Sequence, residues 1–201
     1  SVASVSSHPN DNSLLLARID LADWCKVNSM RINAVKTKEM VVYFGKRFVM
    51  SELPSLSING STIQRVDCFK LLGVYFNSDL TWQHHVEYIL KKVSKRIYFM
   101  YLLMRAGINS SDVVSVYCSL IRTILEYASP VWHAGLTKSQ SDRIEGAQKR
   151  CLKIIFPDLS YNEALFVSGL DKLSVRRDKL ARDLFNDIIN PSNILTYLLT
   201  P

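Results

Sequence analysis

The sequence is poor in features that would point to a metal site, a disulfide framework or a membrane span. Its four cysteines stand far apart, with no C-x-x-C pair and no histidine at the spacing of a zinc ligand set. No run approaches the roughly 18 to 20 apolar residues that a bilayer span needs, and residues 1–13 lack the layout of a signal peptide. We therefore expect a soluble, intracellular protein, cytoplasmic or nuclear, that binds neither a metal ion nor a membrane.

Acidic residues are in the minority, since 18 Asp and Glu stand against 25 Lys and Arg, for a formal net charge of +7. This balance favours polyanionic partners without identifying one. With 201 residues, of which 48% are hydrophobic, the chain is long and apolar enough to bury a core. Because it begins with Ser1 and ends at Pro201 directly after a helical pattern, we expect it to be a fragment of a longer protein.

Residues 1–80 combine one helical pattern with several short β-favouring runs. An apolar face on residues 14–27, which includes Trp24 and Val27, predicts a helix packed against a core. The pair Asn59-Gly60 between two β-favouring runs predicts a hairpin. We expect a small antiparallel sheet with strands at 40–44, 56–58, 62–66 and 69–76.

From residue 81 onward the apolar period becomes that of a helix and stays so. Gly107, Pro157 and Pro191 stand where helices are expected to end. The chain is therefore predicted to be α+β, with a sheet-bearing part at 1–80 followed by an all-helical bundle at 81–201. We expect helices at 82–105, 110–127, 139–156, 161–167 and 174–189.

The predicted helix at 82–105 has one apolar stripe for packing and another face that is cationic. Lys91 with Lys95, and Lys92 with Arg96, are like-charge pairs at i,i+4, each of which destabilises an isolated helix by roughly a few tenths of a kcal/mol. A phosphate backbone would offset that repulsion, whereas a merely solvated face is the alternative that composition favours. The cationic residues are Lys91, Lys92, Lys95, Arg96 and Arg105.

Several short blocks occur in series along the chain. N-x-x-K-T-K occupies 33–38, F-K-L-L-G-V occupies 69–74 and L-T-W occupies 80–82. Farther on stand L-x-Y-x-x-x-V-W at 125–132, Q-x-R-x-x-x-I-I at 148–155 and the pair Arg176-Arg177. Each block alone is common, but their order resembles the non-LTR (LINE-type, Jockey-like) retrotransposon reverse transcriptases over nearly the whole chain.

This resemblance implies that residues 1–80 are the end of a polymerase palm and that residues 81–201 are its thumb and connection region. The cationic helix would then be the first thumb helix, which tracks the primer–template duplex. The implied partners are an RNA–DNA or DNA duplex and the upstream palm and fingers of the parent polymerase.

The resemblance also implies roles for two of the blocks. Asn33, Lys36 and Lys38 would flank the incoming nucleotide, where a fixed ammonium stabilises developing negative charge. Leu72 and Gly73 would lie in the primer grip, where a tight hairpin brings backbone against the primer 3′ end. Without the resemblance, the first block reads as a polar loop and the second as a core strand.

The same resemblance implies that the catalytic residues are missing. Polymerases of this class hold Mg²⁺ on clustered palm carboxylates, because two bridging metal ions need acidic ligands to activate the attacking 3′ hydroxyl. Asp11, Asp20 and Asp23 are isolated, and the family's Asp-Asp turn would fall immediately upstream of Ser1. We therefore expect no catalytic residue, metal ligand or cofactor in this chain, with Mg²⁺ required by the full-length polymerase.

Two other interpretations stay open. One is a non-catalytic nucleic-acid-binding or interaction module that kept the scaffold after losing the enzyme. The other comes from residues 24–104, which resemble the small N-terminal region of the AlkB-homologue tRNA-modifying dioxygenase and methyltransferase. The sequence has neither the H-x-D…H iron triad nor the Gly-rich methyl-donor loop that those activities need.

Three aromatic residues have structural interpretations. His84 and His85 are adjacent, so on a helix they point about 100° apart and cannot form an i,i+4 metal pair. We expect both to be exposed surface histidines. Trp132 is expected to be an aromatic anchor packed between helices.

Overall fold

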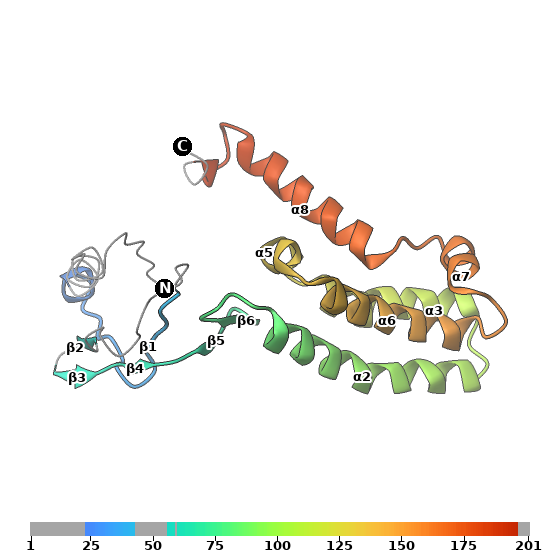
Figure 1. Ribbon diagram of the computed structural model, residues 1–201, viewed down its shortest axis with the longest axis horizontal. Coiled ribbons are helices and arrows are strands. Elements are labelled where there is room, and N and C mark those ends of the chain that lie inside the picture. Colours follow the sequence, from blue (N-terminus) through green and yellow to red (C-terminus); the bar gives the residue numbers. More distant parts are fainter. Residues whose placement is uncertain (1–22, 43–55, 59, 197–201) are drawn as a thin grey trace. The chain divides into compact units, whose positions relative to one another are not determined.

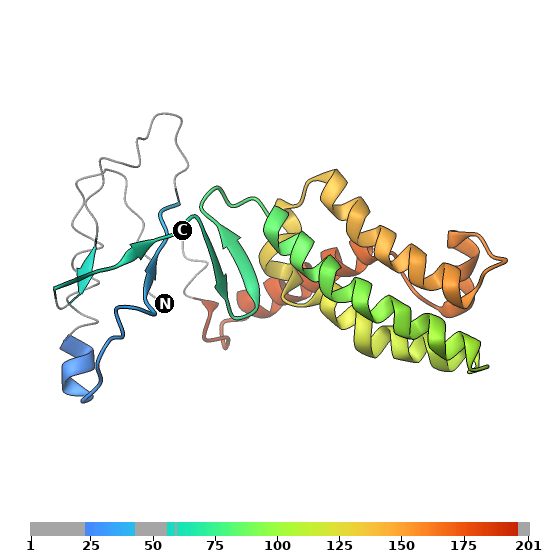
Figure 2. The ribbon, with the colours of Figure 1, turned by 90° about the horizontal axis from the view of Figure 1, so that it is seen from below.

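The computed structural model describes residues 23–42, 56–58 and 60–196 (Figures 1 and 2). The chain divides into two compact units, one of residues 1–69 and 77–79 and the other of residues 70–76 and 80–201. Helices and short strands together make the fold α+β, as predicted. In the part that the structure describes, no helix is long and apolar enough to cross a bilayer.

The described strands of the first unit are only two residues long. β1 (Lys38–Glu39) pairs in parallel with β4 (Gln64–Arg65), and the Arg65 guanidinium donates to the Glu39 carboxylate at 2.8 Å. β2 (Ser57–Ile58) and β3 (Ser61–Thr62) pair antiparallel, with Gly60 between them at a φ of +77°. The hairpin predicted from Asn59-Gly60 is therefore confirmed, although Asn59 itself lies outside the described residues.

Other predictions for this unit need correction. The strands form separate pairs, one of them parallel, and not one antiparallel sheet. Residues 23–27 are helical, but Trp24 and Val27 are 54% and 85% exposed. Residues 40–42 are not in a strand, because β-propensity reflects packing on a half-buried sheet more than a preference of the backbone. The predicted positions 14–22 and 43–44 lie outside the described residues.

A hairpin of β5 (Cys68–Leu71) and β6 (Val74–Asn77) replaces the single strand predicted over 69–76. Leu72 and Gly73 connect its strands, with φ angles of +46° and +89°. Two successive positive φ angles are characteristic of a type I′ turn, whose twist matches that of paired strands. Because leucine rarely adopts a positive φ, the residue pattern of this run gives little sign of a turn.

The second unit consists of the hairpin tip, residues 70–76, and the helices. α2 ends just before Gly107, which has a φ of +78°. Capping boxes begin two later helices, with Thr137 and Gln140 starting α6 and Ser160 and Glu163 starting α7. Four helices agree with the predicted ranges: α2 (Gln83–Arg105), α6 (Lys138–Ile155), α7 (Tyr161–Ser168) and α8 (Leu173–Ile189). A fifth, α3 (Ser110–Tyr117), covers only the first part of the range predicted at 110–127.

The helix predicted over 110–127 is interrupted. After α3 comes a π-helical turn at Cys118–Arg122, followed by α4 (Thr123–Glu126). Two further short elements, α5 (Ser129–Trp132) and a 3₁₀ turn (His133–Gly135), were not predicted. A π turn widens the helix by one residue and leaves a carbonyl free of the regular hydrogen-bond ladder.

α2, α3 and α6 lie side by side around one apolar core, as Figure 2 shows, and α8 packs against α5 and α6. Trp132 is fully buried in this core, and its indole nitrogen donates to the Tyr127 carbonyl at 2.9 Å. The prediction that Trp132 anchors neighbouring helices is therefore confirmed. Other fully buried core residues are Val86, Val93, Tyr117, Ile121, Leu125 and Ile144.

Candidate nucleic-acid interface

The cationic face predicted on α2 is exposed along the helix. Lys91, Lys92 and Lys95 all lie on its solvent side, opposite the buried residues Val86 and Val93. The four ion pairs found among the described residues are formed elsewhere, so none of them neutralises a cation of α2. The positive charge of this face is therefore available to an external anion.

The two predicted arginines of α2 have local contacts. The Arg96 guanidinium donates to the Leu120 carbonyl at 2.6 Å, so it joins α2 to the π-helical turn. The Arg105 guanidinium lies 5.8 Å from the centre of the Tyr101 ring. Both side chains are exposed, and a guanidinium has five N–H donors, so donors remain on each for another partner.

Sequence reasoning missed a cluster of cations and aromatic rings next to this face. Lys70 donates to the Tyr88 hydroxyl at 2.8 Å and lies 4.3 Å from the centre of that ring, and the Lys92 ammonium lies 5.3 Å from the same centre. The Tyr75 and Tyr88 rings meet edge to face at 5.0 Å. The hydrogen bond from Lys70 lowers the pKa of Tyr88 and raises that of Lys70. Lys70 thus extends the positive surface from α2 onto β5.

The tip of the β5–β6 hairpin is held from the end of α4. The Tyr127 hydroxyl donates to the Leu72 carbonyl at 2.9 Å, and a Cβ atom placed on Gly73 would lie 3.2 Å from the Tyr127 ring. The Leu72 side chain is 84% exposed. The turn therefore presents an apolar side chain to solvent on a backbone that a second element holds in place.

His85 lies under the same hairpin, and the prediction that it is exposed is wrong. It is 1% exposed, with its ring centre 5.2 Å from that of Trp132, because adjacent helix positions point about 100° apart and only His84 faces outward. The Tyr75 amide donates to its Nδ1 at 3.4 Å. Burial lowers the pKa of His85 to about 4, so the ring is neutral at pH 7.

The N-x-x-K-T-K block lies in the first unit. The Lys36 amide donates to the Asn33 side-chain oxygen at 3.1 Å, which closes a local turn, and the Lys38 ammonium donates to Gln64 across the β1–β4 pair. Lys36 is exposed. These contacts describe a polar loop leading into a strand, and a role for Asn33, Lys36 and Lys38 beside a nucleotide stays a prediction.

The arginine pair of α8 holds the helix in place. Arg176 binds both oxygens of Glu126, at 2.6 and 3.2 Å, so an internal carboxylate neutralises it. Arg177 is fully buried and donates to the Ser141 hydroxyl at 3.0 Å. Burial lowers the pKa of Arg177. Arg177 therefore belongs to the interior of the bundle, and the half-buried Arg176 is neutralised by Glu126.

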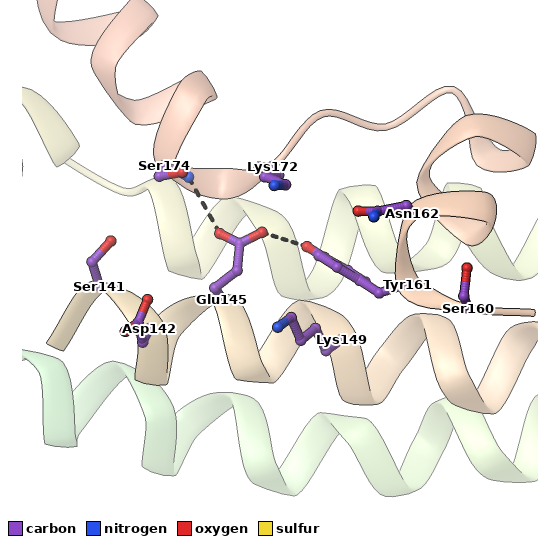
Figure 3. Close-up of a pocket in the computed structure, with 9 residues that line it drawn as sticks. All are labelled: Ser141, Asp142, Glu145, Lys149, Ser160, Tyr161, Asn162, Lys172 and Ser174. Atoms are coloured by element: carbon purple, nitrogen blue, oxygen red, sulfur yellow. Dashed lines mark hydrogen bonds between the residues drawn. The ribbon is translucent and has the colours of Figure 1, made fainter. Parts of the chain in front are cut away.

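A polar cleft of about 420 Å³, which no motif indicated, lies where α6, α7 and the start of α8 meet (Figure 3). The Glu145 carboxylate accepts from the Tyr161 hydroxyl and, at 3.3 Å each, from the amides of Leu173 and Ser174. Glu145 thus caps the N-terminus of α8, where negative charge is stabilised. The lining of the cleft carries charges of both signs, from Asp142 and Glu145 and from Lys149 and Lys172.

Behind the cleft, Gln148 connects the bundle core to Tyr161. Its side chain accepts from the buried Tyr117 hydroxyl at 2.5 Å and donates to the Tyr161 hydroxyl at 2.9 Å. Burial raises the pKa of both tyrosines. This chain of hydrogen bonds fixes the Tyr161 ring. The only sequence signal for it was the glutamine of Q-x-R-x-x-x-I-I.

All four cysteines are free thiols, and no group of three or more His, Cys, Asp or Glu side chains in the described residues is placed to hold a metal ion. Comparisons of the chain with models of protein families, with curated proteins and with solved structures found no match.

Proposed function

We propose that this chain is the end of the palm and the thumb of an RNA-directed DNA polymerase of the non-LTR retrotransposon type. In this proposal it holds a primer–template duplex but lacks the aspartates that perform the chemistry. The observation that carries the proposal is the exposed row of Lys91, Lys92 and Lys95 on α2, which no ion pair among the described residues neutralises.

A cationic helix face of this kind suits a duplex better than a base-specific site. Each Lys that neutralises a phosphate releases condensed counterions, which gives binding that depends on salt and not on sequence. The face also relieves its own repulsion when an anion binds, because Lys91 and Lys95 are one helical turn apart. Lys70, on the strand β5, adds a further cation beside the cationic face of α2.

The hairpin gives the proposal a second support. A primer end must be held by backbone that does not move, and the Leu72 carbonyl is fixed by Tyr127. The exposed Leu72 side chain stands beside that fixed carbonyl and could contact a sugar or a base of the primer. In this proposal, the hairpin tip positions the primer and α2 holds the duplex behind it.

The test is binding of the purified chain to a labelled RNA–DNA hybrid over a series of salt concentrations. The double variant Lys91→Gln/Lys95→Gln should bind more weakly, with a slope of log K against log salt that is flatter by up to about 1.8, from 0.9 per lost phosphate contact. The matched control is Lys138→Gln/Lys179→Gln, which removes the same charge from exposed positions on α6 and α8. Equal losses of affinity in the two variants would mean that binding depends on the total charge of the chain and not on the position of the lysines on α2.

A non-catalytic binding module is the second candidate, since the same exposed cations would serve it equally well. The two differ in what happens when the chain is joined to an upstream palm and fingers. Primer extension by that longer protein, lost again in Lys91→Gln/Lys95→Gln, is expected only for the polymerase. Duplex binding without extension would favour the module.

A further inference from the structure

A second cationic surface lies away from α2, around a groove of about 350 Å³ between α6 and α7. The apolar lining of the groove consists of Leu152, Leu159 and Ala164, of which Leu152 and Ala164 are almost fully buried and Leu159 is half-buried. Lys149, Arg150 and Lys153 line it from α6, and no acidic residue is among the residues that line it, although Glu145 and Glu163 hydrogen-bond to the lining residues Tyr161 and Ser160. The groove therefore combines an apolar surface with concentrated positive charge.

The cations of this groove are available to a ligand. All three are exposed, and none takes part in an ion pair of the described residues. The Lys149 ammonium lies 5.1 Å from the centre of the Tyr161 ring, and the Lys153 ammonium donates to the Pro157 carbonyl at 2.5 Å. These contacts position the two lysines beside the groove without neutralising them.

Tyr161 also lines the groove, and its ring is fixed before any ligand arrives. Glu145 accepts its hydroxyl proton, and Gln148 donates to the same oxygen at 2.9 Å. An aromatic ring held in this way loses little conformational freedom when a flat ligand contacts it. Flat aromatic rings beside cations are what an unpaired base and its phosphates require.

We propose that this groove binds one unpaired nucleotide of a single-stranded nucleic acid, with its base against Leu159 and the Tyr161 ring and its flanking phosphates at Lys149, Arg150 and Lys153. The volume of the groove favours a single strand over a duplex as its ligand. A groove of about 350 Å³ is near the lower end of small-ligand pockets, roughly 300 to 1,000 Å³, and a duplex keeps its bases stacked inside and out of reach. The inference takes the class of partner from the proposed function but uses a different helix.

Gly146 supports a close approach of the strand. It precedes Arg150 and Lys153 by four and seven residues, so the three lie on one face of α6. A Cβ atom placed on Gly146 would meet nothing within 4 Å, so packing does not require a glycine there. A mid-helix glycine costs about 1 kcal/mol relative to alanine. The bare backbone leaves room for a sugar–phosphate chain beside the cations.

The experiment measures the affinity of the full chain for labelled single-stranded RNA and DNA oligonucleotides and for an RNA–DNA hybrid, over a salt series. Arg150→Gln/Lys153→Gln should weaken single-strand binding about tenfold and flatten its salt slope by about 1.4, from 0.7 per lost contact, with hybrid binding nearly unchanged. Lys91→Gln/Lys95→Gln should show the opposite selectivity. The RNA and DNA arms identify which strand the groove prefers.

The outcomes separate the two proposals. The groove proposal would be overturned if Arg150→Gln/Lys153→Gln weakened binding of the single strand and of the hybrid equally, or if the unmodified chain did not bind single strands. Either result would leave the proposal of duplex binding intact. Hybrid binding that is insensitive to Lys91→Gln/Lys95→Gln, with a groove that still binds single strands, would overturn the proposed function alone. All four substitutions are at exposed positions, and unfolding curves verify that the variants fold.

Gly146→Ala gives a readout that a folding defect cannot mimic. Alanine should make α6 more stable, and its methyl group should weaken single-strand binding several-fold through steric contact with the strand. A more stable variant with weaker binding supports the proposed path. Unchanged binding would contradict a strand that crosses α6 at this position.

Discussion

The two hairpins of this chain use turns of the same length but form them for different reasons. The β2–β3 hairpin has Asn59-Gly60, the residue pair that type I′ turns favour, and a Cβ on Gly60 would meet nothing within 4 Å. The β5–β6 hairpin has Leu72-Gly73, with a leucine at a φ of +46°, and it packs against Tyr127 and His85. The first turn is specified by its own residues, whereas the second is imposed by its tertiary contacts.

The difference teaches where backbone strain is tolerated. A non-glycine residue in the left-handed region costs about 1 to 2 kcal/mol, and such a cost persists only where surrounding contacts offset it. Here the offsetting contacts come from α2 and from Tyr127, 55 residues along the chain from Leu72. Strain held in this way is often found at functional sites.

The largest expected effect is a loss of stability at acid pH. His85 accepts from the Tyr75 amide of β6 while neutral, and burial lowers its pKa from 6.5 to about 4. Between these values the unfolded chain takes up a proton that the folded chain does not, so stability falls as the pH drops from about 6.5 to 4. This shift corresponds to about 3 kcal/mol.

Urea unfolding at pH 7 and at pH 4.5, followed by circular dichroism, measures that loss. The contribution of His85 should disappear in His85→Gln and remain in His84→Gln, since His84 is exposed, while His133, whose pKa burial also lowers, contributes in the same window. A pH dependence that is the same in all three proteins would show that His85 is not its source.

Alanine at the two turn glycines compares the hairpins directly. Gly73→Ala should destabilise the protein by about 2 kcal/mol, because a φ of +89° strains alanine and the new methyl group meets the Tyr127 ring at 3.2 Å. Gly60→Ala should cost about 1 kcal/mol, since only its φ of +77° is unfavourable. Thermal unfolding ranks the two variants, and equal costs would contradict a tertiary contribution at Gly73.

Removing one hydroxyl group should have a smaller effect. Tyr127→Phe loses the hydrogen bond to the Leu72 carbonyl but keeps the ring over Gly73, so we expect a loss of about 0.5 to 1 kcal/mol. Tyr98→Phe on α2 is the control, because Tyr98 is 66% exposed. Denaturant midpoints for both variants make the measurement, and identical midpoints would mean that the ring alone holds the turn.

The last effect should be of similar size to that of Tyr127→Phe but opposite in sign, a gain of stability. Leu72→Asn gives the second hairpin the turn residues of the first, and asparagine tolerates a positive φ, so stability should rise by roughly 0.5 to 1 kcal/mol. Differential scanning calorimetry of the variant and the unmodified chain would detect it. A loss of stability would mean that the exposed Leu72 side chain makes contacts that matter to the fold.

The long helices α2 and α6 were predictable from local signals. The apolar period and Gly107 indicated the extent of α2, and the period at residues 139–156 located α6. The β2–β3 hairpin followed from Asn59-Gly60 alone. The exposed lysines of α2 followed from helix geometry, because residues opposite an apolar stripe face solvent. In each case the residues of one segment are enough to predict its structure.

The features that escaped prediction depend on residues distant in sequence. Leu72 turns because Tyr127 holds its carbonyl, and His85 is buried because Trp132 lies against it. The groove between α6 and α7 exists only once Arg150 and Leu159 come together, and a residue pattern does not contain that distance. Local sequence patterns therefore predicted where helices and strands lie. The contacts between them depend on tertiary packing and could not be predicted in this way.

The π-helical turn at Cys118–Arg122 determines the direction in which the side chains of the next helical residues point. One additional residue in a helix rotates the later positions by about 100°. Glu126 and Tyr127 follow this turn by four and five residues, and they reach Arg176 at 2.6 Å and Leu72 at 2.9 Å. A deletion of one residue within the turn would change the composition very little, yet it would swing both side chains away from α8 and from the hairpin at once.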